Sequence, residues 1–273
     1  MIYLDNNGTT RILPEVLEAM LPYFTTEWGN PSSSYKFGSK LKAVIEAARE
    51  QVADLIGAHP REVLFTSCAT ESNNAAIHAA LRANPGKRHI VTSAVEHSSV
   101  LNYCLALEKE GYRVIYLPVD RDGLLTLADL DNAITNETAI VSLMWANNET
   151  GGLFPVKEIA ELCRSRGVLF HCAIPNTELN GHKTQRLANT SNITFHGIES
   201  EALLILLDKE GICASSGSAC LADSDEPSHV IKAMKPDSTA SRQMIRFSLE
   251  VSNSQKEMEQ AVGAVQHCVR ALT

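Results

Sequence analysis

The sequence predicts an α/β fold with a mostly parallel sheet and helices on both faces, followed by a small α+β unit. Short apolar runs alternate with amphipathic helical patterns from about residue 37 to residue 173, and this alternation is typical of a parallel sheet. The polar stretch 174–191 breaks the pattern and is rich in turn formers. We therefore expect a large domain at 1–173, a junction at 174–191 and a small domain at 192–273.

Helices are expected wherever apolar residues recur at intervals of three and four. The longest such stripe runs from Phe37 to Gly57, where glycine ends it. Thr70 stands where the N-cap of the next helix would lie, before Glu71 and an alanine-rich stretch. Further helices are expected at 98–110, 127–134, 156–166, 199–209 and 254–272, with a short one near His229.

Strands are expected at the short apolar runs between these helices, namely 63–65, 89–92, 114–117, 139–145, 168–171, 193–195, 212–214 and 244–249. In an open parallel sheet, ligands bind beyond the carboxyl ends of the strands. Polar clusters follow three of the predicted strands, at 67–72, 96–99 and 147–150. The sequence therefore predicts a functional site at this edge of the sheet.

Composition excludes several classes of function. The 273 residues are 44% apolar and 21% charged, as in a folded globular protein. The net charge of −8 gives no attraction to nucleic acid or to anionic membranes. No stretch approaches the roughly 20 apolar residues that span a bilayer, and the N-terminus has no signal-peptide pattern. We expect a cytoplasmic protein without nucleic-acid or membrane partners.

The seven cysteines are not arranged for disulfides or metal binding. Their number is odd in a chain too long to need disulfides for stability, and neither a CxxC pair nor an HExxH motif occurs. We expect no metal site, and most cysteines should be reduced and buried as small apolar residues.

Two loops carry candidate ligand-binding residues, each with a structural alternative. Small residues and a hydroxyl at 67–71 can hold a phosphate at a helix N-terminus, although ordinary capping by Thr70 explains the same pattern. His97 can lie over a flat aromatic ligand or move protons, but a single histidine in a loop is usually structural.

Three further positions are also open to two interpretations. The amides of Asn147 and Asn148 can orient a polar ring substituent or form an Asx-turn. The small-residue run 215–220 ends in Cys220, which is either a mobile nucleophile or an incidental thiol in a surface loop. Arg246 lies in an apolar strand, where it needs a substrate carboxylate or an internal salt bridge.

Taken together, these segments resemble the cysteine desulfurases of the nitrogen-fixation type, which are fold-type I enzymes of aminotransferase class V. The resemblance covers residue 2 to about 173 and about 186 to the end. Nine ordered segments carry it: YLDNNGTT at 3–10, GNPSS at 29–33, FTS at 65–67, ATES at 69–72, EH at 96–97, NNETG at 147–151, SSGSAC at 215–220, EPSH at 226–229 and IRFSL at 245–249.

The resemblance implies an incomplete fold-type I enzyme and a role for each candidate residue. It implies that Ala69 and Thr70 bind the phosphate of pyridoxal 5'-phosphate and that His97 stacks on the pyridine ring. It also implies that Asn148 contacts the ring oxygen, and that Arg246 holds the carboxylate of L-cysteine. Cys220 would receive the sulfur as a persulfide. The implied partners are a second copy of the chain and a sulfur-accepting scaffold protein for iron–sulfur cluster assembly.

The sequence departs from this family after Phe170 and His171. There the family continues with an aspartate for the pyridine nitrogen, a glutamine and, later, the motif with the Schiff-base lysine, whereas this chain has Cys172 and Ala173. We interpret the difference as an internal deletion. Lys183, in Gly-His-Lys, imitates the missing motif only superficially, because the residues after it match another part of the family.

Three functions follow from this pattern. The first is a cysteine desulfurase that converts L-cysteine to L-alanine, with weak activity because the lysine is missing. The second is an inactive shortened homologue that acts as a dimer partner or sulfur acceptor. The third is a selenocysteine lyase, which the segment around Cys220 does not distinguish from a desulfurase.

Overall fold

The computed structural model describes residues 1–173, 186–217 and 227–273. It divides into two compact units, residues 11–68 and residues 1–10 with 69–273. Within the described ranges, no helix is long and apolar enough to cross a membrane.

The unit of residues 11–68 is helical. Helix α2 (Lys36–Ile56) follows the predicted stripe and ends at Gly57, whose φ of +66° is a left-handed conformation that glycine adopts without strain. Helix α1 (Pro14–Thr25) and the short 3₁₀ helix η1 (Pro60–Glu62) were not predicted. The predicted strand at 63–65 is wrong: this stretch has no strand partner, and the ring of Phe65 lies 4.9 Å from the guanidinium carbon of Arg49.

Four parallel strands form the sheet of the larger unit, in the order β3-β2-β4-β5. They are β2 (His89–Ser93), β3 (Arg113–Leu117), β4 (Thr138–Met144) and β5 (Leu169–Ala173). Every residue of β2 and β4 is buried, as expected for central strands covered on both faces. The predicted α/β fold with a mostly parallel sheet is confirmed.

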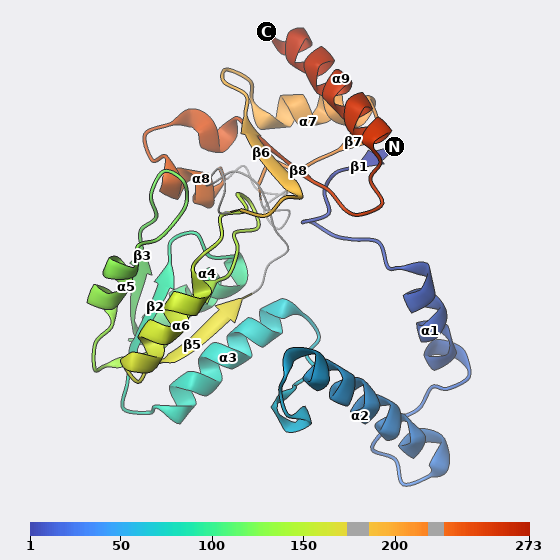
Figure 1. Cartoon of the computed structure of the whole chain (residues 1–273), viewed down its shortest axis with the longest axis vertical. Coiled ribbons are helices and arrows are strands. Elements are labelled where there is room, and N and C mark those ends of the chain that lie inside the picture. The colour runs from blue at the N-terminus through green and yellow to red at the C-terminus, as the bar shows by residue number, and fades with distance from the viewer. Residues whose placement is uncertain (174–185, 218–226) are drawn as a thin grey trace. The chain divides into compact units, whose positions relative to one another are not determined.

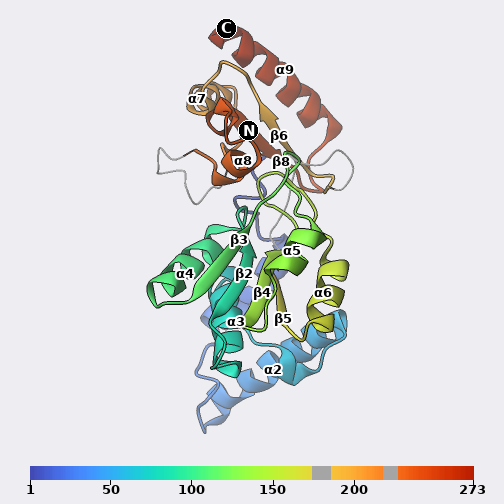
Figure 2. The same cartoon turned by 90° about the vertical axis from the view of Figure 1, so that its left-hand side faces the viewer.

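Helices cover both faces of this sheet (Figure 2). Helices α3 (Ala69–Ala83) and α4 (Ser98–Lys109) pack against one face through a core that includes Ile77, Val100 and Ile90. Helices α5 (Leu127–Ala133) and α6 (Val156–Ser165) pack against the other face through Leu130, Ile159 and neighbouring residues. The consecutive residues Ile90 and Val91 of β2 therefore enter the two different cores, as expected from the two-residue period of a strand.

The C-terminal part has its own core. Strand β6 (Thr190–Thr194) pairs antiparallel with β8 (Met244–Ser248), and α7 (Ser200–Lys209) and α9 (Gln255–Leu272) contribute to the same apolar cluster (Figure 1). Helix α9 begins after a capping box formed by Ser254 and Glu257. Two shorter helices, α8 (His229–Met234) and the 3₁₀ helix η3 (Thr239–Arg242), precede β8.

The N-terminus adds a strand that the sequence did not reveal. Strand β1 (Ile2–Tyr3) pairs in parallel with β7 (Ile212–Cys213), and Asp5 forms a bridge to Ser248 beyond it. Two residues are too few for a detectable period. This pairing brings residues 4–8 into the C-terminal part, where they contact the candidate site.

Two sequence predictions on boundaries have different outcomes. Thr70 is not an N-cap, because α3 already begins at Ala69 and places Thr70 in its first turn. Alanine has the highest helix propensity, which favours the earlier start. The domain division at 174–191 stays a prediction, since residues 174–185 lie outside the described part of the chain.

Candidate functional site

The predicted site residues lie where the parallel strands end. Glu96 and His97 follow β2, and Asn147, Asn148 and Glu149 follow β4, its hydrogen-bonded neighbour in the sheet. The side-chain amide of Asn147 donates to the carbonyl oxygen of Val95 at 2.8 Å, which joins the two loops. The expected edge of the sheet therefore does bring these two clusters together.

His97 is the N-cap of α4. Its Nδ1 accepts a hydrogen bond from the backbone N–H of Ser99 at 3.2 Å and lies 2.9 Å from the Ser99 hydroxyl. Burial lowers the pKa of His97, and the nearby His229 lowers it further. The imidazole is therefore neutral at neutral pH, with Nδ1 as acceptor and the proton on Nε2.

Helix α3 and His97 both contact the hydroxyl of Ser99. The amide of Asn73, one turn after Ala69, donates to the hydroxyl of Ser99 at 2.8 Å. Ala69 and Thr70 are exposed at the helix N-terminus. Backbone N–H groups in a first turn and the positive end of the helix dipole suit an anion such as a phosphate.

The two neighbouring asparagines differ in what their side chains do. Asn147 forms the expected Asx-turn, because its Oδ1 accepts from the backbone N–H groups of Glu149 and Thr150, each at 2.9 Å. The side chain of Asn148 makes no hydrogen bond within the described ranges, although the residue is only 9% exposed. Asn148 thus has an amide available for a ligand, whereas Asn147 supports the turn.

Arg246 forms the internal salt bridge that the sequence left open as an alternative. It is 1% exposed, and its Nη2 donates to Oδ1 of Asp5 at 2.7 Å. Its Nη1 donates to the carbonyl oxygen of Asn148 at 3.3 Å. The amide of Asn7 donates to the same carbonyl at 3.1 Å. The buried guanidinium therefore links the N-terminal segment to the loop after β4.

Sequence reasoning missed the roles of Asp5 and Asn7. Both lie in the YLDNNGTT motif, which was used for the resemblance without a role for either residue. Their partners lie more than 140 positions away, Asn148 for Asn7 and Arg246 for Asp5. A charged residue in an apolar strand signalled that Arg246 needed an anion, but only the fold identifies which one.

Two buried carboxylates were also missed. Glu96 accepts from the Ser93 hydroxyl at 2.9 Å and from the backbone N–H of Met144 at 2.8 Å, and burial raises its pKa to about 7. Glu149 accepts from the hydroxyl of Ser228, and burial raises its pKa against the opposing effects of His229, of that hydrogen bond and of Arg246. Both glutamates lie inside motifs of the resemblance, at 96–97 and 147–151, and this was the available signal.

The remaining predictions concern Cys220, Lys183, the other cysteines and metal binding. Cys220 and Lys183 lie outside the described residues. No two of the described cysteines, which are at positions 68, 104, 163, 172, 213 and 268, form a disulfide with each other. No cluster of three or more potential metal ligands occurs among the described residues.

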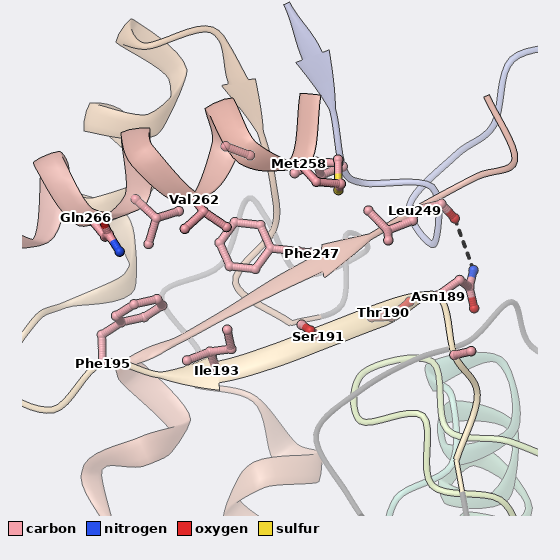
Figure 3. A pocket seen from close by; sticks show the side chains of 14 residues that line it. Asn189, Thr190, Ser191, Ile193, Phe195, Phe247, Leu249, Met258, Val262 and Gln266 are labelled. Atoms are coloured by element: carbon pink, nitrogen blue, oxygen red, sulfur yellow. Dashed lines mark hydrogen bonds between the residues drawn. The ribbon is translucent and has the colours of Figure 1, made fainter. Parts of the chain in front are cut away.

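A separate apolar cavity of about 330 Å³ lies between α9 and the strands β6 and β8 (Figure 3). Ile193, Phe195, Phe247 and Val262 point into it, and Asn189 donates from its rim to the carbonyl oxygen of Leu249 at 3.1 Å. No predicted site residue lines it. The cavity is therefore distinct from the site at the strand ends.

Comparison with known proteins gives a consistent family match. The family model "Aminotransferase class-V" matches residues 2–173 and 172–261. "Cysteine desulfurase 2" of Trichormus variabilis is 38% identical over 363 residues, covering 96% of this chain and 91% of the relative. "Cysteine desulfurase NifS" of Azotobacter vinelandii is 35% identical over 374 residues, covering 99% of this chain and 93% of the relative.

Solved structures share the fold. A structure titled "NIFS-LIKE PROTEIN" has a TM-score of 0.83 at 24% identity and covers 99% of both chains. A structure titled "SspA in complex with cysteine" has a TM-score of 0.79 at 24% identity, covering 91% of this chain and 99% of the other.

The sequence alignments also locate a difference in length. Alignments over 363 and 374 residues exceed the 273 residues of this chain, so part of each relative has no counterpart here. The two segments of the family match meet at residues 172–173. The missing block predicted from the sequence begins at this point.

Proposed function

Because this chain belongs to the aminotransferase class-V family, we propose that it is a cysteine desulfurase, which converts L-cysteine to L-alanine and passes the sulfur to a protein cysteine. The observation that carries the proposal is that His97 and Asn148 follow two adjacent parallel strands, whose loops are joined by the hydrogen bond from Asn147 to Val95. The names of the reported relatives favour this reaction over that of a selenocysteine lyase.

The family cofactor is pyridoxal 5'-phosphate, and the described residues fit its non-covalent contacts. The first turn of α3 is open for the phosphate at Ala69 and Thr70. A neutral, half-buried imidazole at His97 suits stacking on a flat ring, and the amide of Asn148 has no partner among the described side chains. When bound, the cofactor supplies an electron sink for chemistry at the amino-acid α- and β-carbons.

A lysine that would hold the cofactor covalently is not part of the described site. Within the described ranges, neither Asn148 nor Arg246 forms a hydrogen bond or ion pair with a lysine. Lys183 lies outside these ranges, and we propose that it does not take this role. We therefore expect weak activity in the isolated chain, with any activity dependent on added cofactor.

We propose that Arg246 binds the carboxylate of L-cysteine, and the geometry sets a condition on this role. Both Nη atoms of Arg246 already donate, one to Asp5 and one to the carbonyl oxygen of Asn148. Nε is buried and has no partner among the described residues. Each Nη also carries a second N–H, so a substrate carboxylate must approach Nε or one of these N–H groups, or displace the side chain of Asp5.

The sulfur-transfer step is proposed for Cys220. Its thiolate attacks the sulfur of L-cysteine, an S–S bond forms, and the Cβ–S bond of the substrate breaks. The β-carbon takes up a proton, so that alanine leaves and a persulfide remains on Cys220. A sulfur-accepting scaffold protein for iron–sulfur clusters would then remove the outer sulfur atom.

The organisation and setting of the protein are part of the same proposal. Residues 1–173 form the incomplete cofactor-binding domain, 174–191 the junction and 192–273 the small domain that carries Cys220. The chain acts as a homodimer in the cytoplasm, without nucleic-acid partners. The relatives' names support a cysteine desulfurase.

Absorbance spectra of the purified protein with added pyridoxal phosphate test the proposal, combined with borohydride trapping and mass spectrometry. An adduct on one lysine, with alanine and sulfide released from cysteine, supports a working desulfurase. Cys220→Ala should abolish persulfide, whereas Cys213→Ala, at a partly buried thiol of strand β7 outside the site, should leave it unchanged. Folded protein that neither binds the cofactor nor releases alanine would refute the proposed activity.

A further inference from the structure

His229 connects helix α8 to the loop that carries His97. It is the first residue of α8, and its Nε2 lies 3.0 Å from the carbonyl oxygen of Glu96. A carbonyl oxygen only accepts hydrogen bonds, so Nε2 of His229 carries a proton and is the donor. This carbonyl group belongs to the peptide bond between Glu96 and His97. The contact therefore holds the backbone at the point where His97 begins.

His97 is also held on its C-terminal side, by its own helix. Its Nδ1 accepts from the backbone N–H of Ser99, which sets the direction of the ring. Its carbonyl oxygen accepts from the backbone N–H groups of Val100 and Leu101, at 2.9 and 3.1 Å. These contacts hold His97 relative to α4. The contact from His229 adds a hydrogen bond from a second helix, on the N-terminal side of the ring.

The residue before His229 holds the start of α8 in place. Ser228 is the N-cap of α8, and its Oγ accepts from the backbone N–H of Ile231 at 3.1 Å. The same hydroxyl donates to the carboxyl group of Glu149, and the backbone N–H of Ser228 donates to the carbonyl oxygen of Ser241 at 3.3 Å. Ser228 and Glu149 are both buried, and buried polar groups lose free energy when they separate. His229 therefore follows a well-fixed residue.

Apolar packing holds the same helix against the sheet. Val230 and Ile231 belong to the buried core that also contains Val95 and Met144. Val95 lies directly before the loop of His97, and Met144 is the last residue of β4. A helix of six residues is not stable by itself, so α8 depends on this packing. The start of α8 thus has a defined position at the ends of β2 and β4.

Ser228 and His229 together bridge the two loops of the candidate site. Ser228 contacts the residue that follows Asn148, in the loop after β4. His229 contacts the residue that precedes His97, in the loop after β2. The electrostatics agree with this arrangement, because the proximity of His229 contributes to the lowered pKa of His97. Two consecutive residues of α8 therefore act on both loops.

We propose that His229 is a positioning residue for His97: the hydrogen bond from its Nε2 to the carbonyl oxygen of Glu96 holds the imidazole of His97 in the orientation that accepts a flat ring. The functional part rests on the proposed stacking of His97 on pyridoxal phosphate. The hydrogen bond and its effect on the loop can be measured without the cofactor.

NMR of the ¹⁵N-labelled full chain tests the donor directly. At pH 8, long-range ¹H–¹⁵N spectra should show a proton on Nε2 of His229. A proton on Nδ1 alone would overturn the proposal, because Nε2 could then not donate to Glu96. This measurement uses the unaltered protein, so it remains decisive if a variant does not fold.

Two substitutions of His229 differ in whether a donor remains at the position of Nε2. The amide of glutamine reaches about as far as Nε2, whereas that of asparagine ends near the position of Nδ1. Hydrogen exchange, read by mass spectrometry, should accelerate about fivefold in peptides covering 97–103 of His229→Asn, as expected for one lost hydrogen bond. His229→Gln should stay within about twofold of the parent. Lys232→Gln, an exposed change on the same helix, is the control and should alter nothing.

Titration with pyridoxal phosphate, followed by absorbance, tests the consequence for the site. The Kd should rise about fivefold in His229→Asn and stay within about twofold in His229→Gln. Glutamine also removes the charge of a protonated imidazole. Equal losses in both variants would therefore assign the effect to charge and reject positioning.

The remaining outcomes separate positioning from general stability and from cofactor binding. Exchange that accelerates equally in β2 and β4 of His229→Asn would show a general loss of stability and overturn the proposal. If the parent does not bind pyridoxal phosphate, the proposed role of His97 fails. The NMR and exchange data then still decide whether His229 positions His97.

Discussion

Asp5 and Arg246 form a buried ion pair, with 2.7 Å between Oδ1 and Nη2, although 241 positions separate them in the chain. The pair closes the N-terminal segment onto strand β8 beside the site. The side chain of Arg246 is 1% exposed and that of Asp5 is 18% exposed. Losing its partner should therefore cost more free energy for the fully buried Arg246 than for the partly exposed Asp5.

This inequality predicts the effect of breaking the pair. Asp5→Asn leaves a fully buried guanidinium without its counter-ion and should lower the free energy of unfolding by about 3 kcal/mol. Arg246→Met leaves only a partly exposed carboxylate and should cost less. Urea unfolding followed by circular dichroism measures both. A double variant less stable than Asp5→Asn alone would contradict this account.

Asn147 and Asn148 should respond differently to truncation. Asn147→Ala removes two hydrogen bonds to backbone N–H groups and one to the carbonyl oxygen of Val95. We expect a loss of about 3 kcal/mol, because buried groups are left unpaired. Asn148→Ala removes no hydrogen bond among the described residues and should cost under about 1 kcal/mol. Asn148→Ala should instead weaken pyridoxal phosphate binding, measured by absorbance titration.

Glu96 should make stability fall as pH rises. Burial raises its pKa from 4.5 to about 7, so the folded protein keeps a proton that the unfolded chain loses above pH 4.5. Its contribution is therefore fully present below pH 4.5, is lost up to pH 7 and is constant above that. The total is about 3 kcal/mol. Unfolding of the parent and Glu96→Gln between pH 5 and 8 should reveal this slope only in the parent.

The cysteines should differ in reactivity. Burial raises the pKa of Cys104 to about 12 and that of Cys163 to about 11, whereas Cys68 is exposed. Only the thiolate reacts, so iodoacetamide at pH 8 should label Cys68 at least a hundredfold faster than Cys104. Mass spectrometry of native protein, with urea-unfolded protein as control, provides the comparison. Equal labelling in native protein would show that these cores open readily.

Patterns in the sequence determined the local elements and the position of the site. The period of apolar residues predicted α2, the strands β2 and β4 and the helices between them, because each depends on neighbours within a few positions. The order of strands and helices then placed His97 and Asn148 at one edge of a parallel sheet. Strand β1 was not predicted, because its two residues are too few to show an alternation of apolar and polar residues.

Only the tertiary structure determined which side chains form contacts that hold the fold together. It joined Arg246 to Asp5, assigned the turn to Asn147 rather than Asn148, and buried Glu149 against Ser228. Each of these contacts links segments far apart in the chain or separates neighbours with identical chemistry. Local periodicity contains no information on such pairs. Sequence alone therefore identified the residue types of the site, and the packing of distant segments determined their partners.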